Sequence, residues 1–226
     1  MTTILITGAH RGIGREMAKQ ALAKGWRVIG SVRYQEHADE ALVSLGTDFF
    51  PIIFDVTDQE AIERAAATID EPIDILINNS GVIGPSRQSS LDMDFHGFEL
   101  TLAINTIGPL RVSQAFLQHL RKSDNGRLLI ISSIMGSMAQ TSFDRIAYRA
   151  SKAGVNKVLQ GLANDLEPEG IAAVSIHPGW VRTDMGGPNA SIAPEASAAG
   201  VLEIADRLSL SETGRFLNYD GSEIDW

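Results

Sequence analysis

The sequence predicts an α/β fold in which a doubly wound, seven-stranded parallel sheet carries helices on both faces. Short runs rich in β-branched residues alternate with longer helical patterns along the 226 residues, as in parallel sheets joined by crossover helices. This length allows one sizeable core and is short for two. Since neither a linker nor an internal repeat is recognisable, we expect a single domain spanning residues 1–226.

The β-branched runs define the expected strands, because such side chains suit a pleated, buried surface. In chain order the strands are Thr3–Thr7, Arg27–Val32, "FFPIIFD" (49–55), Ile73–Asn78, "GRLLIIS" (126–132), Ile171–His177 and "GRFLNY" (214–219). Helices are expected between them, at about Gly12–Lys24, Gln35–Leu45, "DQEAIERAAATI" (58–69), Gly97–Arg121, Ala147–Leu166 and Pro194–Leu208. The Gly- and Pro-rich stretch at 177–196 is too long for a simple crossover and indicates a functional loop.

The composition excludes several classes of protein. The formal net charge of -9 argues against a nucleic-acid or anionic membrane partner. The absence of cysteine excludes disulfides, cysteine–metal sites and a thiol nucleophile. The N-terminus lacks the basic region and long apolar core of a signal peptide, and no run reaches the roughly 18 apolar residues that span a bilayer. We therefore expect a soluble cytoplasmic protein without a bound metal.

A glycine-rich loop directly follows the first expected strand. It reads "TGAHRGIG" and contains Gly8, Gly12 and Gly14. Glycines at this point let the chain turn tightly, let the backbone approach a pyrophosphate and let the next helix pack close to the strand. The N-terminus of that helix, which includes Ile13, offers free N–H groups and a positive dipole end to phosphates. A loop of this kind between a strand and a helix predicts a dinucleotide site.

The end of the second expected strand bears on the choice of dinucleotide. An acidic residue there would hydrogen-bond the adenosine ribose and repel a 2′-phosphate. The chain has Val32 at this position, then Arg33, and Arg11 in the glycine-rich loop is a second cation in the same region. Because guanidinium groups suit phosphate geometry, we expect NADP(H) rather than NAD(H). Either arginine could instead be a solvated surface charge.

Polar residues also follow the third and fourth expected strands. Asp55, which precedes Val56, can accept a hydrogen bond from an adenine amino group or cap the next helix. Asn79 and Gly81 belong to "NNSG", whose amides can satisfy strand-end backbone groups and line a cofactor cleft. We expect all four residues to contact the cofactor, although local capping could also explain these segments.

A tyrosine and a lysine, Tyr148 and Lys152, stand four residues apart in "YRASK". On a helix such residues are neighbours. A phenol with its ordinary pKa near 10 is a poor acid–base catalyst at neutral pH, and lowering that pKa by about three requires roughly 4 kcal/mol. A fixed ammonium nearby favours the phenolate, as does the positive nicotinamide ring of an oxidised cofactor, so we expect Lys152 and the bound cofactor together to lower the pKa of Tyr148.

Taken in order, "TGAHRGIG", "NNSG", Ser133 and "YRASK" resemble the motifs of the short-chain dehydrogenase/reductase family over essentially the whole chain. The segments "HPGWVRTDMGG" and "FLNYDGSEIDW" are similar to its sniffer and C-factor branch of small carbonyl-reductase-like members. The resemblance implies a Rossmann fold. Two features depart from the family pattern: "NNSG" stands where NNAG is usual, and the spacing from Ser133 to Tyr148 is longer than is common.

The resemblance also implies catalytic roles for four residues. Tyr148 would donate a proton to a carbonyl oxygen as hydride arrives from NADPH, and Lys152 would hold the nicotinamide ribose. Ser133 would hold the substrate oxygen, unless it only caps a strand end. Asn105 would hold a water that links Lys152 to solvent. Pro109 supports that role because it has no N–H for the carbonyl of Asn105, although a simple packing kink is the alternative.

The loop after the sixth expected strand is implicated by the same resemblance. It places the backbone of Val181 and Thr183 against the nicotinamide amide. His177 precedes the turn and is expected to be structural rather than catalytic. The expected substrate loop comprises Trp180, Met185 and the segment at about 184–196.

Two functions of different classes are consistent with these motifs. One is an NADPH-dependent carbonyl reductase for small aldehydes or ketones, which would oxidise the alcohol in reverse. The other is a dinucleotide-binding signalling protein of the C-factor type. The Tyr148–Lys152 pair favours the reductase, because a sensor needs no acid–base pair, although a dual role stays open. The resemblance further implies a homodimer or homotetramer that packs through the helices at Gly97–Arg121 and Ala147–Leu166.

Overall fold

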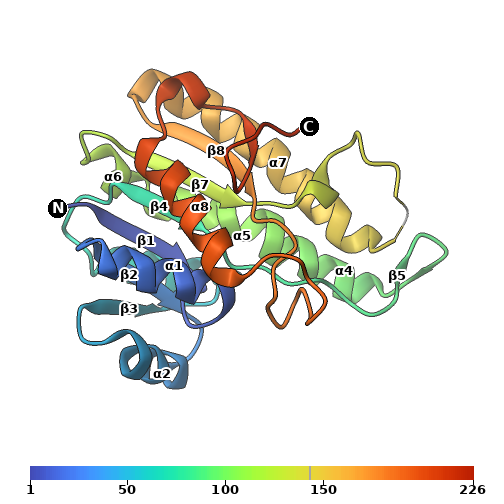
Figure 1. Cartoon of the computed structure of the whole chain (residues 1–226), viewed down its shortest axis with the longest axis horizontal. Coiled ribbons are helices and arrows are strands. Elements are labelled where there is room, and N and C mark those ends of the chain that lie inside the picture. Colours follow the sequence, from blue (N-terminus) through green and yellow to red (C-terminus); the bar gives the residue numbers. More distant parts are fainter. Residues whose placement is uncertain (143) are drawn as a thin grey trace.

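The central element of the protein is a seven-stranded parallel sheet, confirming the predicted fold class (Figure 1). The computed structural model describes residues 1–142 and 144–226. Its strand order is β3-β2-β1-β4-β7-β8-β9. The strands are β1 (Thr3–Thr7), β2 (Arg27–Val32), β3 (Phe49–Ile53), β4 (Ile75–Asn78), β7 (Arg127–Ile131), β8 (Ala172–His177) and β9 (Phe216–Asn218). The order reverses between β1 and β4, and ligands of such sheets bind outside the carboxyl ends of the strands at that point.

The inner strands are buried and largely apolar because helices cover both faces of the sheet. All five residues of β1 are buried. Successive side chains point to opposite faces: Ile4 and Ile6 pack into one hydrophobic cluster, whereas Leu5 packs into the other. These two clusters are the layers of core on either side of the sheet.

One face of the sheet is covered by α1, α2 and α8, and the other by α3, α5, α6 and α7. Figure 1 shows α1 and α8 side by side on their face. The helices are α1 (Gly12–Ala23), α2 (Gln35–Leu45), α3 (Gln59–Ala66), α4 (Phe95–Leu102), α5 (Gly108–Ala115), α6 (Leu117–Arg121), α7 (Ile146–Leu166) and α8 (Pro194–Arg207). Single turns lie at Ile134–Gly136, Glu167–Glu169 and Leu210–Glu212.

The helix expected at Gly97–Arg121 is not continuous. A π-helical turn at Ala103–Ile107 separates α4 from α5, and the N–H of Gly108 donates to the carbonyl of Ala103. Pro109 explains the interruption, because it has no N–H for the ordinary helical bond to Asn105. A second break at Phe116 begins α6. The sequence identified the cause of the first break but not the wider turn that results.

A small antiparallel hairpin lies outside the main sheet and was not predicted. It pairs β5 (Gln88–Ser89) with β6 (Asp92–Met93) and joins β4 to α4. Each strand has only two residues, too few for a readable alternation of apolar and polar positions. Among the described residues, no helix combines the length and apolar character that a membrane span requires.

Candidate active site

A cavity of about 800 Å³ opens at the carboxyl ends of the strands, beside the switch point between β1 and β4. Its size falls within the roughly 300–1,000 Å³ of typical cofactor and ligand sites. The residues expected from the sequence that line it are Gly8, Arg11, Gly12, Ile13, Gly14, Arg33, Asp55, Val56, Asn79, Gly81, Tyr148, Lys152 and Thr183. Asn105, Ser133 and Val181 were also expected at the site but lie outside this lining.

The glycine-rich loop is folded so tightly that a side chain is disfavoured at Gly8 and Gly14. A Cβ at Gly14 would lie 2.3 Å from the carbonyl oxygen of Gly8 and 2.6 Å from the amide nitrogen of the Asn79 side chain. Gly8 itself has a φ of +69°, a conformation that L side chains rarely adopt. The start of α1 therefore lies directly against the end of β1, as the glycine pattern predicted.

Thr7 and Asn79 join the ends of β1 and β4. The Thr7 hydroxyl accepts hydrogen bonds from the backbone N–H groups of Asn79 (2.9 Å) and Ser80 (3.0 Å). The Asn79 side chain donates to the Thr7 carbonyl at 2.8 Å. Thr7 was not predicted as a site residue, because a threonine inside a strand carries no sequence signal of its own.

The two arginines expected to select the dinucleotide lie at the rim of the cavity. Arg33 Nε is 3.3 Å from Asp55 Oδ2, and Arg11 Nη1 is 3.5 Å from Asp184 Oδ2. Asp55 also accepts hydrogen bonds from the backbone and hydroxyl of Thr57. All four paired side chains are at least one-third exposed, so each ion pair contributes little and can be exchanged for another anion.

The phenol of Tyr148 is buried in the first turn of α7. Burial raises its pKa above the ordinary value, and the side chain of Ser133 and the charge of Arg145 oppose this rise in part. Lys152, which was expected to lower this pKa together with the positive nicotinamide ring, is not among the groups that lower it in the protein itself. The desolvation of the phenol dominates, and the lysine amine is directed elsewhere.

Lys152 is buried beside Tyr148 and donates a hydrogen bond to the carbonyl of Ile131 at 2.8 Å. Its Nζ lies 5.8 Å from the centre of the Tyr148 ring. Burial lowers the pKa of Lys152 to about 8, so the side chain is mostly charged at neutral pH. The two side chains share the cavity wall, as their helical spacing predicted.

Asn105 lies behind the cavity wall and connects three segments. Its side-chain nitrogen donates to the carbonyl of Val82 (2.8 Å) and to the Ser151 hydroxyl (3.0 Å), and its oxygen accepts from the Val82 N–H (2.9 Å). A Cβ at Gly81 would lie 3.3 Å from Asn105 Oδ1 and 3.6 Å from Lys152 Nζ. Because glycine has no side chain, position 81 leaves space in front of Asn105 Oδ1 and Lys152 Nζ.

Gln88 of β5 is a further site residue that sequence reasoning missed. It is buried, and its Oε1 accepts the backbone N–H of Tyr148 at 3.1 Å. Its Nε2 donates to the carbonyls of Ile83 (3.1 Å) and Pro85 (2.7 Å). The first-turn N–H groups of a helix need such partners, and Arg145 provides no side-chain cap. Gln88 therefore fixes the start of α7 against the opposite cavity wall.

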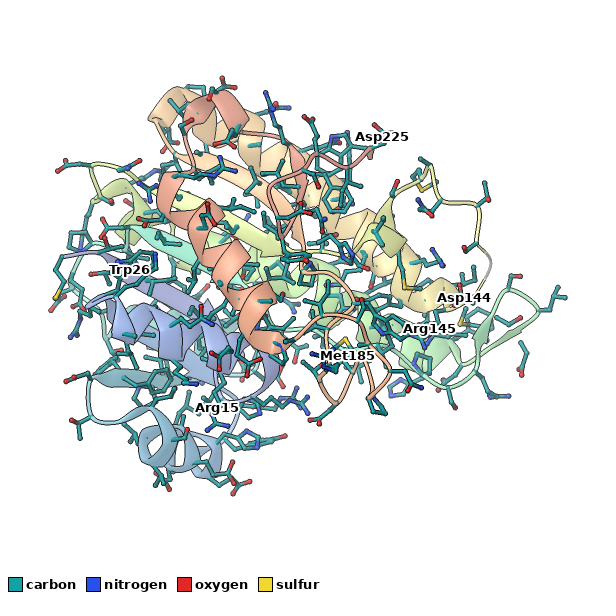
Figure 2. All side chains as sticks on the ribbon, in the orientation of Figure 1. Arg15, Trp26, Asp144, Arg145, Met185 and Asp225 are labelled. Carbon is teal, nitrogen blue, oxygen red and sulfur yellow. The ribbon has the colours of Figure 1, made fainter. Side chains whose placement is uncertain are left out.

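The loop between β8 and α8 closes one side of the cavity with Thr183 and Met185. Figure 2 shows Met185 on this loop, ahead of α8. The indole of Trp180 donates to the Gly186 carbonyl at 2.9 Å, and Val181 forms a bridge to Ile192. Trp180 and Val181 support the loop and do not line the cavity.

His177 lies at the end of β8, outside the cavity lining. Burial lowers its pKa to about 4, which keeps the ring neutral at physiological pH. This environment agrees with the structural character expected from its position before the turn. The loop from Ser133 to Tyr148 includes Phe143, which lies outside the described residues.

A doubly wound parallel sheet with a glycine-rich loop at its switch point defines the Rossmann class of α/β proteins. A family model described as short chain dehydrogenase matches residues 2–192. The chain therefore belongs to the short-chain dehydrogenase family and is an oxidoreductase by that membership, confirming the resemblance seen in the motifs.

Within this family, the chain is similar to one curated protein and two solved structures in particular. The chain is 43% identical to the C-signal protein of Myxococcus xanthus over 156 residues, which cover 69% of this chain and 93% of the relative. Its fold is similar to that of the carbonyl reductase Sniffer of D. melanogaster, with a TM-score of 0.93 and 30% identity over 100% of both chains. It is also similar to an NADPH-bound carbonyl reductase from chicken fatty liver, with a TM-score of 0.91, 29% identity, and coverage of 100% of this chain and 99% of the other.

Proposed function

We propose that the protein is an NADP-dependent carbonyl reductase, which reduces a small aldehyde or ketone and oxidises the alcohol in the reverse direction. The observation that carries this proposal is that Tyr148 and Lys152 line the same cavity as the glycine-rich loop. The likeness to carbonyl reductases, one of them described as NADPH-bound, supports the reaction type and the cofactor.

The residues around the cavity fit a phosphorylated dinucleotide. The close approach of Gly14 to Gly8 brings the N-terminus of α1 to the cavity wall, where its free N–H groups suit a pyrophosphate. The space in front of Gly81 suits a ribose, which Lys152 would hold. Arg11 and Arg33 at the rim would exchange their aspartate partners for the 2′-phosphate.

The bound NADPH would supply hydride to the carbonyl carbon. The side chains would supply the proton and hold the carbonyl oxygen that receives it. Because burial raises the pKa of Tyr148, the phenol is protonated at neutral pH and is suited to donate to a carbonyl oxygen. Ser133 would hold that oxygen. Lys152, with a pKa of about 8, would place a positive charge near the phenolate that forms. Asn105 would hold the water that returns a proton to this pair.

Apolar side chains in the cavity lining favour an apolar substituent on the substrate. The cavity that Tyr148 lines is also lined by Val82, Ile83, Pro85, Leu100 and Met185. Burying apolar area stabilises a complex by about 25 cal/mol per Å². We therefore expect aldehydes and ketones with aromatic or branched aliphatic groups to be better substrates than small polar ones.

A dinucleotide-binding regulatory function is the second candidate, and the likeness to the C-signal protein favours it. A homodimer or homotetramer and a cytoplasmic location belong to the proposal for either function. The exposed apolar side chains of Phe95 on α4 and Ile107 in the π-helical turn, both outside the cavity lining, support an interface on this side of the molecule.

NADPH consumption with a panel of aromatic and aliphatic aldehydes and ketones tests the proposal. The reductase predicts turnover that Tyr148→Phe lowers by about 10²–10⁴-fold while NADPH affinity is kept. Tyr219→Phe removes a phenol outside the cavity and serves as the matched control. A protein that binds NADPH but reduces none of the panel would favour the regulatory candidate.

A further inference from the structure

His10, in the glycine-rich loop, has no place in the reaction described above. It lines the cavity, and its ring stacks on that of His37 with centroids 4.2 Å apart and planes 3° from parallel. The loop is held in this position by β2, because the N–H of Ala9 donates to the carbonyl of Ser31 at 3.0 Å. His37 belongs to α2, which follows β2. The pairing of β1 with β2 thus brings the two rings together.

The stack leaves one nitrogen of each ring enclosed and unpaired. Neither His10 Nδ1 nor His37 Nδ1 has a hydrogen-bond partner within residues 1–142 and 144–226. Buried polar atoms without a partner are uncommon and call for an explanation. Because Nδ1 of His10 is enclosed, Nε2 is the ring nitrogen through which a ligand in the cavity can meet this residue.

The charges that face His10 come from three segments. Arg11 lies on the same loop, Arg33 follows β2, and His37 and Glu40 lie on α2. Burial, followed by the charges of His37 and Arg11, lowers the pKa of His10; Glu40 acts in the opposite direction and Arg33 adds to the lowering. The ring is therefore mostly neutral at pH 7, although two guanidinium groups at the rim mark the region as an anion site.

We propose that His10, supported by its stack on His37, is a ligand of the 2′-phosphate of NADP(H) and takes up a proton when that phosphate binds. This inference rests on the proposed NADP-dependent function. A phosphate dianion between Arg11, Arg33 and His10 favours the charged imidazole and accepts a charge-assisted hydrogen bond from Nε2–H. The neutral ring in the free protein adds no further positive charge to the two guanidinium groups, which are each paired with an aspartate.

The proposal predicts a pH dependence specific to the phosphorylated dinucleotide. A ligand that raises the pKa of one group binds more weakly as the pH rises between the free and bound pKa values, by at most about tenfold per pH unit. The phosphate has its own second pKa near 6, so the informative window is about pH 7 to 8.5. There, the Kd for NADP⁺ should rise several-fold more than the Kd for NAD⁺, because Lys152, whose pKa is about 8, titrates in the same window and acts on both dinucleotides alike.

Titration calorimetry of the full chain with NADP⁺, in two buffers of different ionisation enthalpy, measures the proton uptake directly. We expect the uptake to be larger by up to one proton per NADP⁺ than per NAD⁺, since any change at Lys152 is common to both. His10→Asn should abolish this difference in proton uptake and the difference in pH dependence. His96→Asn on α4, outside the cavity lining, is the matched control and should keep both.

The variant His37→Phe distinguishes the stacking role of His37 from the binding of the phosphate by His10. It retains an aromatic partner for His10 and should keep most of the proton uptake. Binding of NAD⁺ by each variant verifies that the cavity is folded. Tight binding of NADP⁺ with no more proton uptake than NAD⁺, or a difference in uptake unchanged in His10→Asn, would overturn this inference alone. The absence of NADP⁺ binding at every pH would instead overturn the proposed function.

Discussion

The rim and the wall of the cavity differ in how their charges are held. At the rim, Arg11 and Arg33 form exposed ion pairs with aspartates, and such pairs are weak and easily exchanged. In the wall, Tyr148 and Lys152 are buried. Desolvation raises the pKa of Tyr148 and lowers that of Lys152, and both shifts favour the neutral form of the side chain. We therefore propose a division of labour in which the rim selects the ligand and the wall supports the chemistry.

The largest expected loss of stability and of dinucleotide binding comes from adding a side chain at Gly14, which packs against the end of β1. Gly14→Ala would place a Cβ 2.3 Å from the Gly8 carbonyl oxygen, and forcing such contacts costs about 1–3 kcal/mol or more. We expect a clearly lower thermal midpoint together with the loss of dinucleotide binding, both measurable by thermal unfolding with and without NADPH. Unchanged stability would mean that the loop can relax away from β1.

The next largest effect should come from Gln88, which holds the Tyr148 backbone. Gln88→Met keeps the size of the side chain but leaves the Tyr148 N–H and two carbonyls without their partner. A buried unsatisfied group costs about 1–3 kcal/mol, and we expect about 2 kcal/mol in denaturant unfolding. Gln118→Met, at an exposed position of α6, should change stability little. Equal effects of the two variants would mean that Gln88 does not hold the start of α7.

A pH-dependent effect should follow from the burial of Lys152. Its pKa is about 8 when folded and 10.5 ordinarily, so the unfolded chain binds more protons between these values. Stability therefore rises with pH in that window, by at most about 1.4 kcal/mol per pH unit, as the cost of a buried charge is relieved. The free energy of unfolding of the wild type, measured against Lys152→Met, should show this rise. A flat difference would mean that Lys152 is well solvated.

The smallest effect is expected outside the cavity, on the same helix as Tyr148. A Cβ at Gly161 meets nothing within 4 Å, and glycine inside a helix costs about 1 kcal/mol relative to alanine. Gly161→Ala should therefore stabilise the protein by about 0.5–1 kcal/mol in denaturant unfolding, with no change in dinucleotide affinity. Destabilisation would show that glycine at this position has a packing role.

The parts of the site that depend on local pattern could be predicted from the sequence. The strands were readable because residues buried on both faces form continuous apolar runs, and the Tyr148–Lys152 pair because helical spacing fixes which side chains adjoin. Gly14 was readable from its place between a strand and a helix.

The parts that depend on distant contacts could not be predicted. Gln88 meets Tyr148 through a hairpin without a local signal, and His10 meets His37 only because β1 pairs with β2. The spacing of Tyr148 and Lys152 revealed a nearby amine, which favours a lower pKa of the phenol, but not the burial that raises this pKa. Desolvation of Tyr148 depends on all the segments packed around it, so the local sequence between Tyr148 and Lys152 carries no signal for it.

The division of labour between rim and wall is tested most directly by measuring two quantities in two variants: the Kd for NADPH and the maximal rate of carbonyl reduction at saturating NADPH. Arg33→Ala should raise the Kd by about tenfold or more, since hydrogen bonds to charged groups contribute about 1.5–3 kcal/mol, and should leave the maximal rate nearly unchanged. Tyr148→Phe should lower the maximal rate by about 10²–10⁴-fold and leave the Kd nearly unchanged. Turnover retained in Tyr148→Phe, or an effect of both variants on the same quantity, would contradict the account.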